Sequence, residues 1–65
     1  MPSSVIRTFE YDAREHRLDI EFVTGRLYSY HGVPDRTVAA FRAAQSKGSF
    51  FNRRIRDHFP FTRKR

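Results

Sequence analysis

The stretch that decides the fold is RLDIEFVTGRLYSY, residues 17–30. In its first part Leu18, Ile20 and Phe22 alternate with acidic residues, which is the period of two of a half-buried strand. Residues 23–25, VTG, follow as a three-residue loop that places a glycine where φ must be positive. The stretch therefore predicts an antiparallel hairpin with one apolar face.

The length of that loop fixes how the second strand of the hairpin pairs. A three-residue loop ending at Gly25 pairs Ile20 with Tyr28 and Leu18 with Tyr30. A two-residue turn would shift the pairing by one residue and turn both tyrosines away from the apolar face. We therefore prefer the first register. It gives the tyrosines a structural role, which we favour over base stacking on an exposed sheet.

The residues on either side of the hairpin complete an α+β domain. Residues 5–12, VIRTFEYD, are rich in β-branched and aromatic side chains and predict a first strand. Apolar residues at helical spacing in 35–45 and 46–58 predict two helices. We expect a three-stranded antiparallel meander, in the order βββαα, with both helices packed on one face. We place one domain at residues 1–60 and a basic C-terminal tail at 61–65.

Capping residues predict where the two helices begin. Either Asp35 caps the first helix or Pro34 occupies an early helical position. Gly48 is expected to interrupt the chain after this helix. The second helix then begins with Ser46 or Ser49 as its cap.

The second predicted helix has an apolar face and a basic face. At 100° per residue Phe51, Ile55 and His58 lie on one side, and Arg53 and Arg56 lie opposite. We therefore expect His58 to pack with the core. The expected core comprises Phe9, Leu18, Ile20, Phe22, Tyr28, Tyr30, Val38, Phe41, Phe51 and Ile55.

The positive charge is concentrated in the second part of the chain. Thirteen basic and seven acidic residues give a net charge of +6, but residues 1–41 carry −1 and residues 42–65 carry +7. This asymmetry favours a polyanionic partner over a role in solubility alone. Cysteine is absent, and no apolar run is typical of a membrane span or signal peptide. We expect a cytoplasmic protein without a membrane partner.

The candidate nucleic-acid site is the basic segment SKGSFFNRRIRDH, residues 46–58, with the tail FPFTRKR. Arginine suits phosphate because its planar fork donates two hydrogen bonds to one anion. Lys47 lies at a helix N-terminus, which favours anions, and Phe50 is the best-placed residue for stacking. The candidate nucleic-acid-binding residues are Lys47, Phe50, Asn52, Arg53, Arg54, Arg56, Arg63, Lys64 and Arg65.

Other functions compete with nucleic-acid binding. Each arginine taken alone is more simply a solvated residue, or, for Arg53, an ion-pair partner of Asp57. An acidic protein partner or a homodimer would also use the basic face and the ten aromatic residues. The three histidines have no spacing typical of a metal site or of acid–base catalysis. We expect no enzyme activity, no metal and no cofactor.

The chain resembles a known family, the KTSC domain. The resemblance lies in Tyr28-Ser29-Tyr30, Val33-Pro34 and the string SKGSFFNRRIR, residues 46–56, and it covers about residues 3–58. This module is named for its occurrence at the C-terminus of some lysyl-tRNA synthetases, and it also occurs alone as a small bacterial protein. RNA binding has been suggested for the family, so the resemblance implies RNA in preference to DNA. It implies no catalytic residues.

Overall fold

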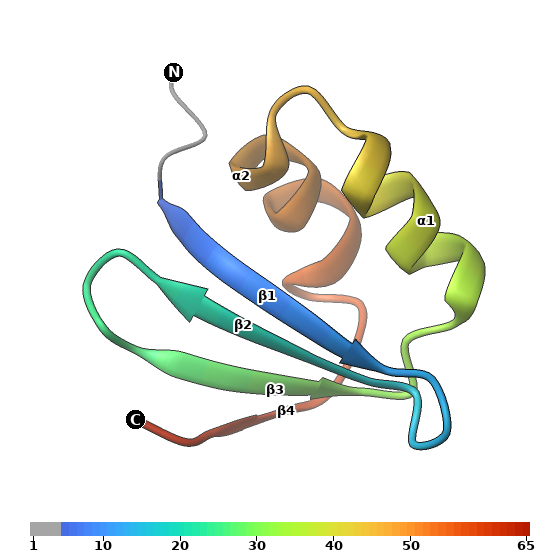
Figure 1. The fold of residues 1–65 in the computed structure, drawn as a ribbon, viewed down its shortest axis with the longest axis horizontal. Helices are drawn as coiled ribbons and strands as arrows, with labels where there is room; N and C mark the ends of the chain where they lie inside the picture. The colour runs from blue at the N-terminus through green and yellow to red at the C-terminus, as the bar shows by residue number, and fades with distance from the viewer. Residues whose placement is uncertain (1–4) are drawn as a thin grey trace.

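Four antiparallel strands form one sheet, and the helical segments cover one of its faces (Figure 1). The computed structural model of the chain describes residues 5–65. The strands lie in the order β1-β2-β3-β4, so each pairs with its neighbour in sequence. The elements are β1 (Ile6–Asp12), β2 (Arg17–Phe22), β3 (Leu27–His31), α1 (Asp35–Ala43), α2 (Lys47–Phe50), the π-helix η1 (Phe51–Ile55) and β4 (Phe61–Arg63).

The hairpin of β2 and β3 has the register that the three-residue loop predicts. Ile20 pairs with Tyr28 and Leu18 pairs with Tyr30. Gly25 has a φ of +92° and donates its N–H to the carbonyl of Phe22 at 2.9 Å. Because side chains alternate between the faces of a strand, this register brings both tyrosines to the face that the helices cover.

The prediction of three strands is wrong, because residues 61–63 of the expected tail form a fourth strand. β4 pairs with β3 through Tyr28 opposite Arg63 and Tyr30 opposite Phe61. The ring of Phe61 stacks on that of Tyr28 with centroids 5.2 Å apart. The backbone groups along the outer edge of β3 require partners, and β4 supplies them. A strand of three residues is too short to show a period of two in the sequence.

The first helix begins without a side-chain cap. Pro34 occupies the N-cap position of α1, and its carbonyl accepts the N–H of Thr37 at 3.0 Å. Asp35 is the first residue of the helix and does not cap it, and Pro34 lies before the helix in an extended conformation, so both predictions for this end are wrong. The carboxylate of Asp35 lies 2.8 Å from the hydroxyl of Tyr11, which also lies 2.6 Å from the carbonyl oxygen of Val33. These contacts join β1 to the start of α1.

The second helical segment begins at the predicted cap but ends earlier than predicted. The hydroxyl of Ser46 accepts the N–H of Ser49 at 3.3 Å, which selects Ser46 as the cap. Gly48 lies inside α2 and is buried, so it does not interrupt the chain as predicted. The segment continues as η1, in which the N–H of Arg56 bonds the carbonyl of Phe51 at 2.8 Å, and the helix ends at Ile55.

The π turn changes which residues face the sheet. Phe51 and Ile55 remain buried, 7% and 0% exposed. His58 is exposed, and its Nε2 lies 2.9 Å from the carbonyl oxygen of Arg53. The prediction that His58 packs on the apolar face is therefore wrong. A π-helix turns by fewer degrees per residue than the α-helix that the prediction assumed, and the chain leaves the helix after Ile55.

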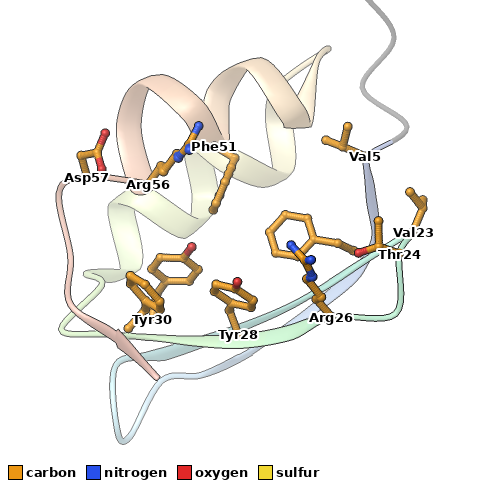
Figure 2. Close-up of a pocket in the computed structure, with 11 residues that line it drawn as sticks. Val5, Val23, Thr24, Arg26, Tyr28, Tyr30, Phe51, Arg56 and Asp57 are labelled. Carbon is orange, nitrogen blue, oxygen red and sulfur yellow. The ribbon is translucent and has the colours of Figure 1, made fainter. Parts of the chain in front are cut away.

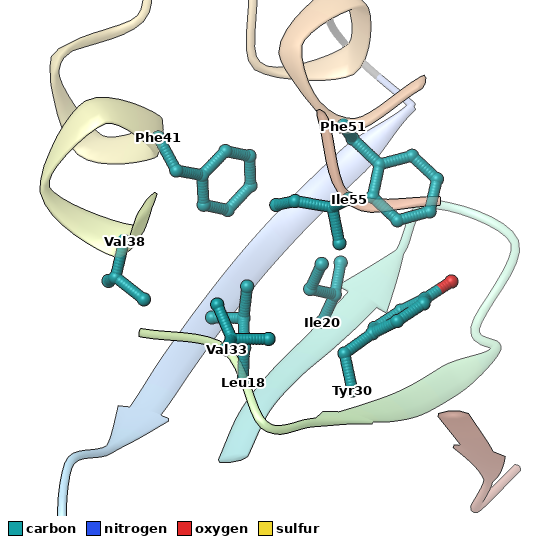
Figure 3. Close-up of a cluster of buried hydrophobic side chains, with 8 residues drawn as sticks. All are labelled: Leu18, Ile20, Tyr30, Val33, Val38, Phe41, Phe51 and Ile55. Atoms are coloured by element: carbon teal, nitrogen blue, oxygen red, sulfur yellow. The ribbon is translucent and has the colours of Figure 1, made fainter. Parts of the chain in front are cut away.

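The core lies between the sheet and the helices (Figure 3). Most of the expected core residues are buried, and Val33, which was not expected, joins them. Phe9, Phe22 and Tyr28 are only partly buried and pack against this core. The buried hydrophobic residues of the described chain are Leu18, Ile20, Tyr30, Val33, Val38, Phe41, Phe51 and Ile55.

Candidate nucleic-acid interface

Three arginines lie exposed on the outer side of η1 and at its C-terminal end, and we call Arg53, Arg54 and Arg56 the arginine surface. Burial of Phe51 and Ile55 turns Arg53 and Arg54, which lie between them, outward, and Arg56 follows directly after Ile55. Arg53 and Arg56 are exposed, as their positions on the predicted helix require, and Arg54, which the sequence places near the boundary of the two faces, is exposed as well.

None of these arginines is paired with a carboxylate within residues 5–65. In that part of the chain the side-chain ion pairs are those of Arg17 with Asp12 and Asp19, and of Arg65 with Glu21. The ion pair considered for Arg53 is therefore not formed. Three guanidinium groups within four positions keep their charge available to an anion in solvent.

The neighbours of the arginine surface hold two of its members in place. The guanidinium of Arg54 lies over the ring of Phe50, 5.6 Å from the ring centroid. Arg56 contacts the side-chain oxygen of Asn52 at 3.5 Å, one turn earlier. Asn52 is exposed beside the arginines, as expected for a residue that contacts a phosphate or a base edge.

Two residues of the predicted site have structural roles instead. The ammonium of Lys47 donates to the carbonyls of Arg42 and Ala44, both at 3.2 Å, and so caps the end of α1. Phe50 is half-buried, with its ring 5.6 Å from that of Phe41. Because one side of this ring meets Phe41 and Arg54 lies over it, Phe50 is a poor platform for a base.

The basic residues at the C-terminus lie on β4 and directly after it, beside the outer edge of β3. Arg63, Lys64 and Arg65 are all exposed. Arg65 is held by Glu21 at 3.2 Å, and the Nε of Arg63 donates to the carbonyl of Arg65 at 3.3 Å. The pairing of β4 with β3 thus holds in place basic residues that were expected on a C-terminal tail.

A groove of about 530 Å³ opens between η1, the β2–β3 hairpin and β4 (Figure 2). Five aromatic residues dominate its apolar lining, together with Val5 and Val23: Phe22, Tyr28, Tyr30, Phe51 and Phe61. Tyr28 lies near-parallel to Phe61, with an angle of 20° between their planes, and at 22° to Tyr30. The rings thus form a ladder across β3 and β4, whose outer member, Phe61, remains 53% exposed.

Charged side chains line the same groove. Arg26 comes from the hairpin side, and Arg56 and Asp57 come from the end of the helical segment (Figure 2). Burial and the neighbouring Tyr28 raise the pKa of Tyr30 to about 12, which the positive charge of Arg56 opposes. The Tyr30 phenol is therefore neutral at physiological pH and can donate and accept hydrogen bonds at the groove.

The sequence analysis missed this groove. The hairpin register predicted which face Tyr28 and Tyr30 share, but not the pairing of β3 with residues 61–63 that brings Phe61 beside them. The periodicity assigned both tyrosines to the core, which is correct for Tyr30, whereas Tyr28 is only partly buried. Arg26 follows the turn directly, and no sequence pattern marked it as a binding residue.

The three histidines lie on the loop before β2, at the end of β3 and after η1, and none of them lines the groove. The Nε2 of His31 lies 3.0 Å from the hydroxyl of Thr62, and His16 occupies the loop before β2 with a φ of 52°. Within residues 5–65, no three side chains of the metal-binding types gather into a possible site. In the same part of the chain, no helix has the length and apolar character needed to span a membrane.

Comparison with known proteins identifies relatives over nearly the whole chain. An uncharacterised protein of Stutzerimonas stutzeri (strain A1501) is 40% identical over 52 residues, which are 80% of this chain and 73% of that protein. A lysine–tRNA ligase of Nostoc punctiforme is 40% identical over 58 residues, but these cover 89% of this chain and only 10% of the ligase.

A solved structure and a family model agree with these matches. The crystal structure of a KTSC domain protein from Yersinia pestis superposes with a TM-score of 0.87 at 38% identity, over 97% of this chain and 89% of that chain. The model of the KTSC domain family matches residues 2–59. The chain therefore belongs to the KTSC domain family.

Proposed function

We propose that this domain is a cytoplasmic, non-catalytic module that binds single-stranded nucleic acid, RNA in preference to DNA. The observation that carries the proposal is the arginine surface, three exposed guanidinium groups that no carboxylate of residues 5–65 neutralises. Arginine forks match phosphate oxygens in geometry and charge. Exposed guanidinium groups of this kind attract a phosphate backbone of any sequence.

Two further observations support an RNA partner. The excess charge of +7 in residues 42–65 lies on one continuous part of the chain, which now includes the exposed Arg63 and Lys64 of β4 and its end. A segment related to this chain also occurs in a protein named lysine–tRNA ligase. By its name, that protein acts on an RNA. The match covers a tenth of that ligase, so its activity is not carried over.

The salt dependence of binding tests the electrostatic mechanism. The arginine surface together with Arg63 and Lys64 supplies contacts for about five phosphates of a single strand. At about −0.7 per phosphate, log K should fall with log salt at a slope near −3.5. A polarisation titration of a labelled twelve-nucleotide RNA over a series of salt concentrations measures this slope.

A matched pair of variants separates a local surface from net charge. Replacing Arg53, Arg54 and Arg56 together by glutamine should reduce the slope by about 2. The control replaces three exposed arginines outside this surface, Arg7, Arg14 and Arg36, and removes the same charge. Absence of binding by the wild type at low salt would contradict the proposal. An equal decrease of the salt slope in both triple variants would show that binding depends on net charge alone and not on the arginine surface.

One observation favours the alternative, a protein-interaction or homo-oligomerisation module. The large hydrophobic residues that remain exposed in the described chain, Val5, Val23 and Phe61, all line the groove. An apolar cluster of this kind can be covered by a second copy or by an acidic partner. Light scattering at high protein concentration measures the mass directly, and a strict monomer contradicts self-assembly.

A further inference from the structure

The aromatic residue that remains exposed within residues 5–65, Phe61, lies in the groove. The ring centroid of Phe61 lies 5.2 Å from that of Tyr28 and 5.5 Å from that of Tyr30, yet the residue remains 53% exposed. The ring is therefore held in one orientation by its neighbours while it remains open to solvent. A fixed, exposed aromatic ring is the kind of surface on which nucleobases stack.

The charges at the groove favour a polyanionic occupant over an apolar peptide. Arg26 and Arg56 enter from opposite sides, from the hairpin and from the helical segment, and Asp57 is the acidic lining residue (Figure 2). Neither arginine has a carboxylate partner within residues 5–65. A strand that crosses the groove would meet a guanidinium before and after the aromatic rings. The volume of about 530 Å³ lies within the range of about 300–1,000 Å³ that is typical of ligand sites.

We propose that the groove is a nucleobase subsite, in which one base of a single strand stacks on Phe61 beside Tyr28 and its flanking phosphates lie on Arg26 and Arg56. This inference rests on the proposed function and deepens it. The arginine surface supplies attraction that is independent of the bases. Stacking on Phe61 adds an interaction that requires a base to be present and depends little on salt.

Two probes of equal charge distinguish these contributions. One is a twelve-nucleotide oligoadenylate RNA, and the other is an abasic ribose-phosphate strand of the same length. Stacking of one base on an aromatic residue corresponds to an affinity difference of about 5- to 140-fold. At one fixed salt concentration the wild type should therefore bind the oligoadenylate at least about 5-fold more tightly than the abasic strand.

A pair of identical substitutions locates the stacking residue. Phe61→Leu keeps an apolar side chain on β4 but removes the ring, and it should reduce the preference for the oligoadenylate to below about 2-fold. The control is Phe50→Leu, which alters the half-buried ring next to Arg54 and should leave the preference unchanged. Arg26→Gln should weaken the binding of both strands equally and reduce the salt slope by about 0.7.

Each outcome decides between the two proposals. If neither strand binds, both the proposed function and the subsite fail. If both strands bind equally and with steep salt dependence, the proposed function stands and the subsite is overturned. A preference that is lost in Phe50→Leu but retained in Phe61→Leu also overturns the subsite. A wild-type dimer whose dissociation is required for RNA binding would assign the groove to a second copy and overturn it as well.

A measurement on the wild type keeps the test valid if Phe61→Leu does not fold. Addition of adenosine monophosphate should shift the ring proton resonances of Phe61 and Tyr28 through the ring current of the stacked base, whereas those of Phe50 should remain in place. Addition of ribose 5-phosphate at the same concentration should leave the rings unaffected. Equal ring shifts with both compounds, or none with either at millimolar concentration, would overturn the subsite.

Discussion

Replacing Ile55 by alanine tests how the arginine surface is held on the sheet. Ile55 is the last residue of η1, is fully buried, and lies in the cluster that joins the helical layer to β2 and β3 (Figure 3). Its neighbours Arg54 and Arg56 belong to the arginine surface. Loss of the Ile55 side chain should therefore weaken the fold and the presentation of these arginines together.

The size of the effect follows from the burial of the side chain. Alanine removes three carbon groups, worth about 0.8 kcal/mol each in transfer from water. The cavity left behind raises the expected loss in free energy of unfolding to between about 2 and 5 kcal/mol. A 65-residue domain has a total of about 3–10 kcal/mol at the usual values per residue. Ile55→Ala should therefore leave a substantial fraction of the chain unfolded.

Ile55→Val provides a graded version of the same change. It should cost about 0.5–1.5 kcal/mol and lower the melting temperature by about 4–8 °C for each kcal/mol. Its affinity for RNA should remain within about two-fold of the wild type, because the arginines still point outward. Val23→Ala is the control, since Val23 is 56% exposed and the change should stay within about 0.5 kcal/mol.

Urea unfolding followed by circular dichroism measures these differences. The midpoint should fall in the order wild type, Ile55→Val, Ile55→Ala, while the slope of free energy against urea remains constant. A loss below about 1 kcal/mol in Ile55→Ala would refute the packing of η1 described above. It would also remove the structural reason for the outward direction of Arg53, Arg54 and Arg56.

Two further predictions concern the turn and the groove. Gly25→Ala should cost about 1–2 kcal/mol in thermal unfolding, because φ is +92° and the strain lies in the backbone, with nothing within 4 Å of the added carbon. Unchanged stability would contradict this. Tyr30→Phe should flatten the alkaline loss of stability. With a folded pKa of about 12 against 10.0 for the unfolded chain, the contribution of Tyr30 is full below pH 10 and is lost as the pH rises through 12. A wild-type and a Tyr30→Phe profile that coincide between pH 10 and 12 would contradict the shift.

The candidate site was predictable where it depends on one helix. Phe51 and Ile55 mark the buried face of the helix, so Arg53 and Arg56 were assigned correctly to its exposed face. The assignment of His58 failed because a π turn replaced the α geometry on which the helical wheel rests. Lys47 lies where the sequence places it, at the start of the helix, but its ammonium bonds the end of α1. A sequence pattern does not show such a contact between separate elements.

The sequence by itself determined the hairpin, its register and the side of the helix on which the arginines lie. These features depend on neighbouring residues: side chains alternate along a strand, a glycine permits positive φ at residue 25, and apolar residues recur at helical spacing. Only the tertiary structure decided the fourth strand and the groove. The pairing of Tyr28 and Tyr30 with residues 61–63 joins parts of the chain about thirty residues apart. A strand of three residues has no stability of its own and forms only where β3 offers it a free edge. That pairing completes the aromatic groove between the two arginines.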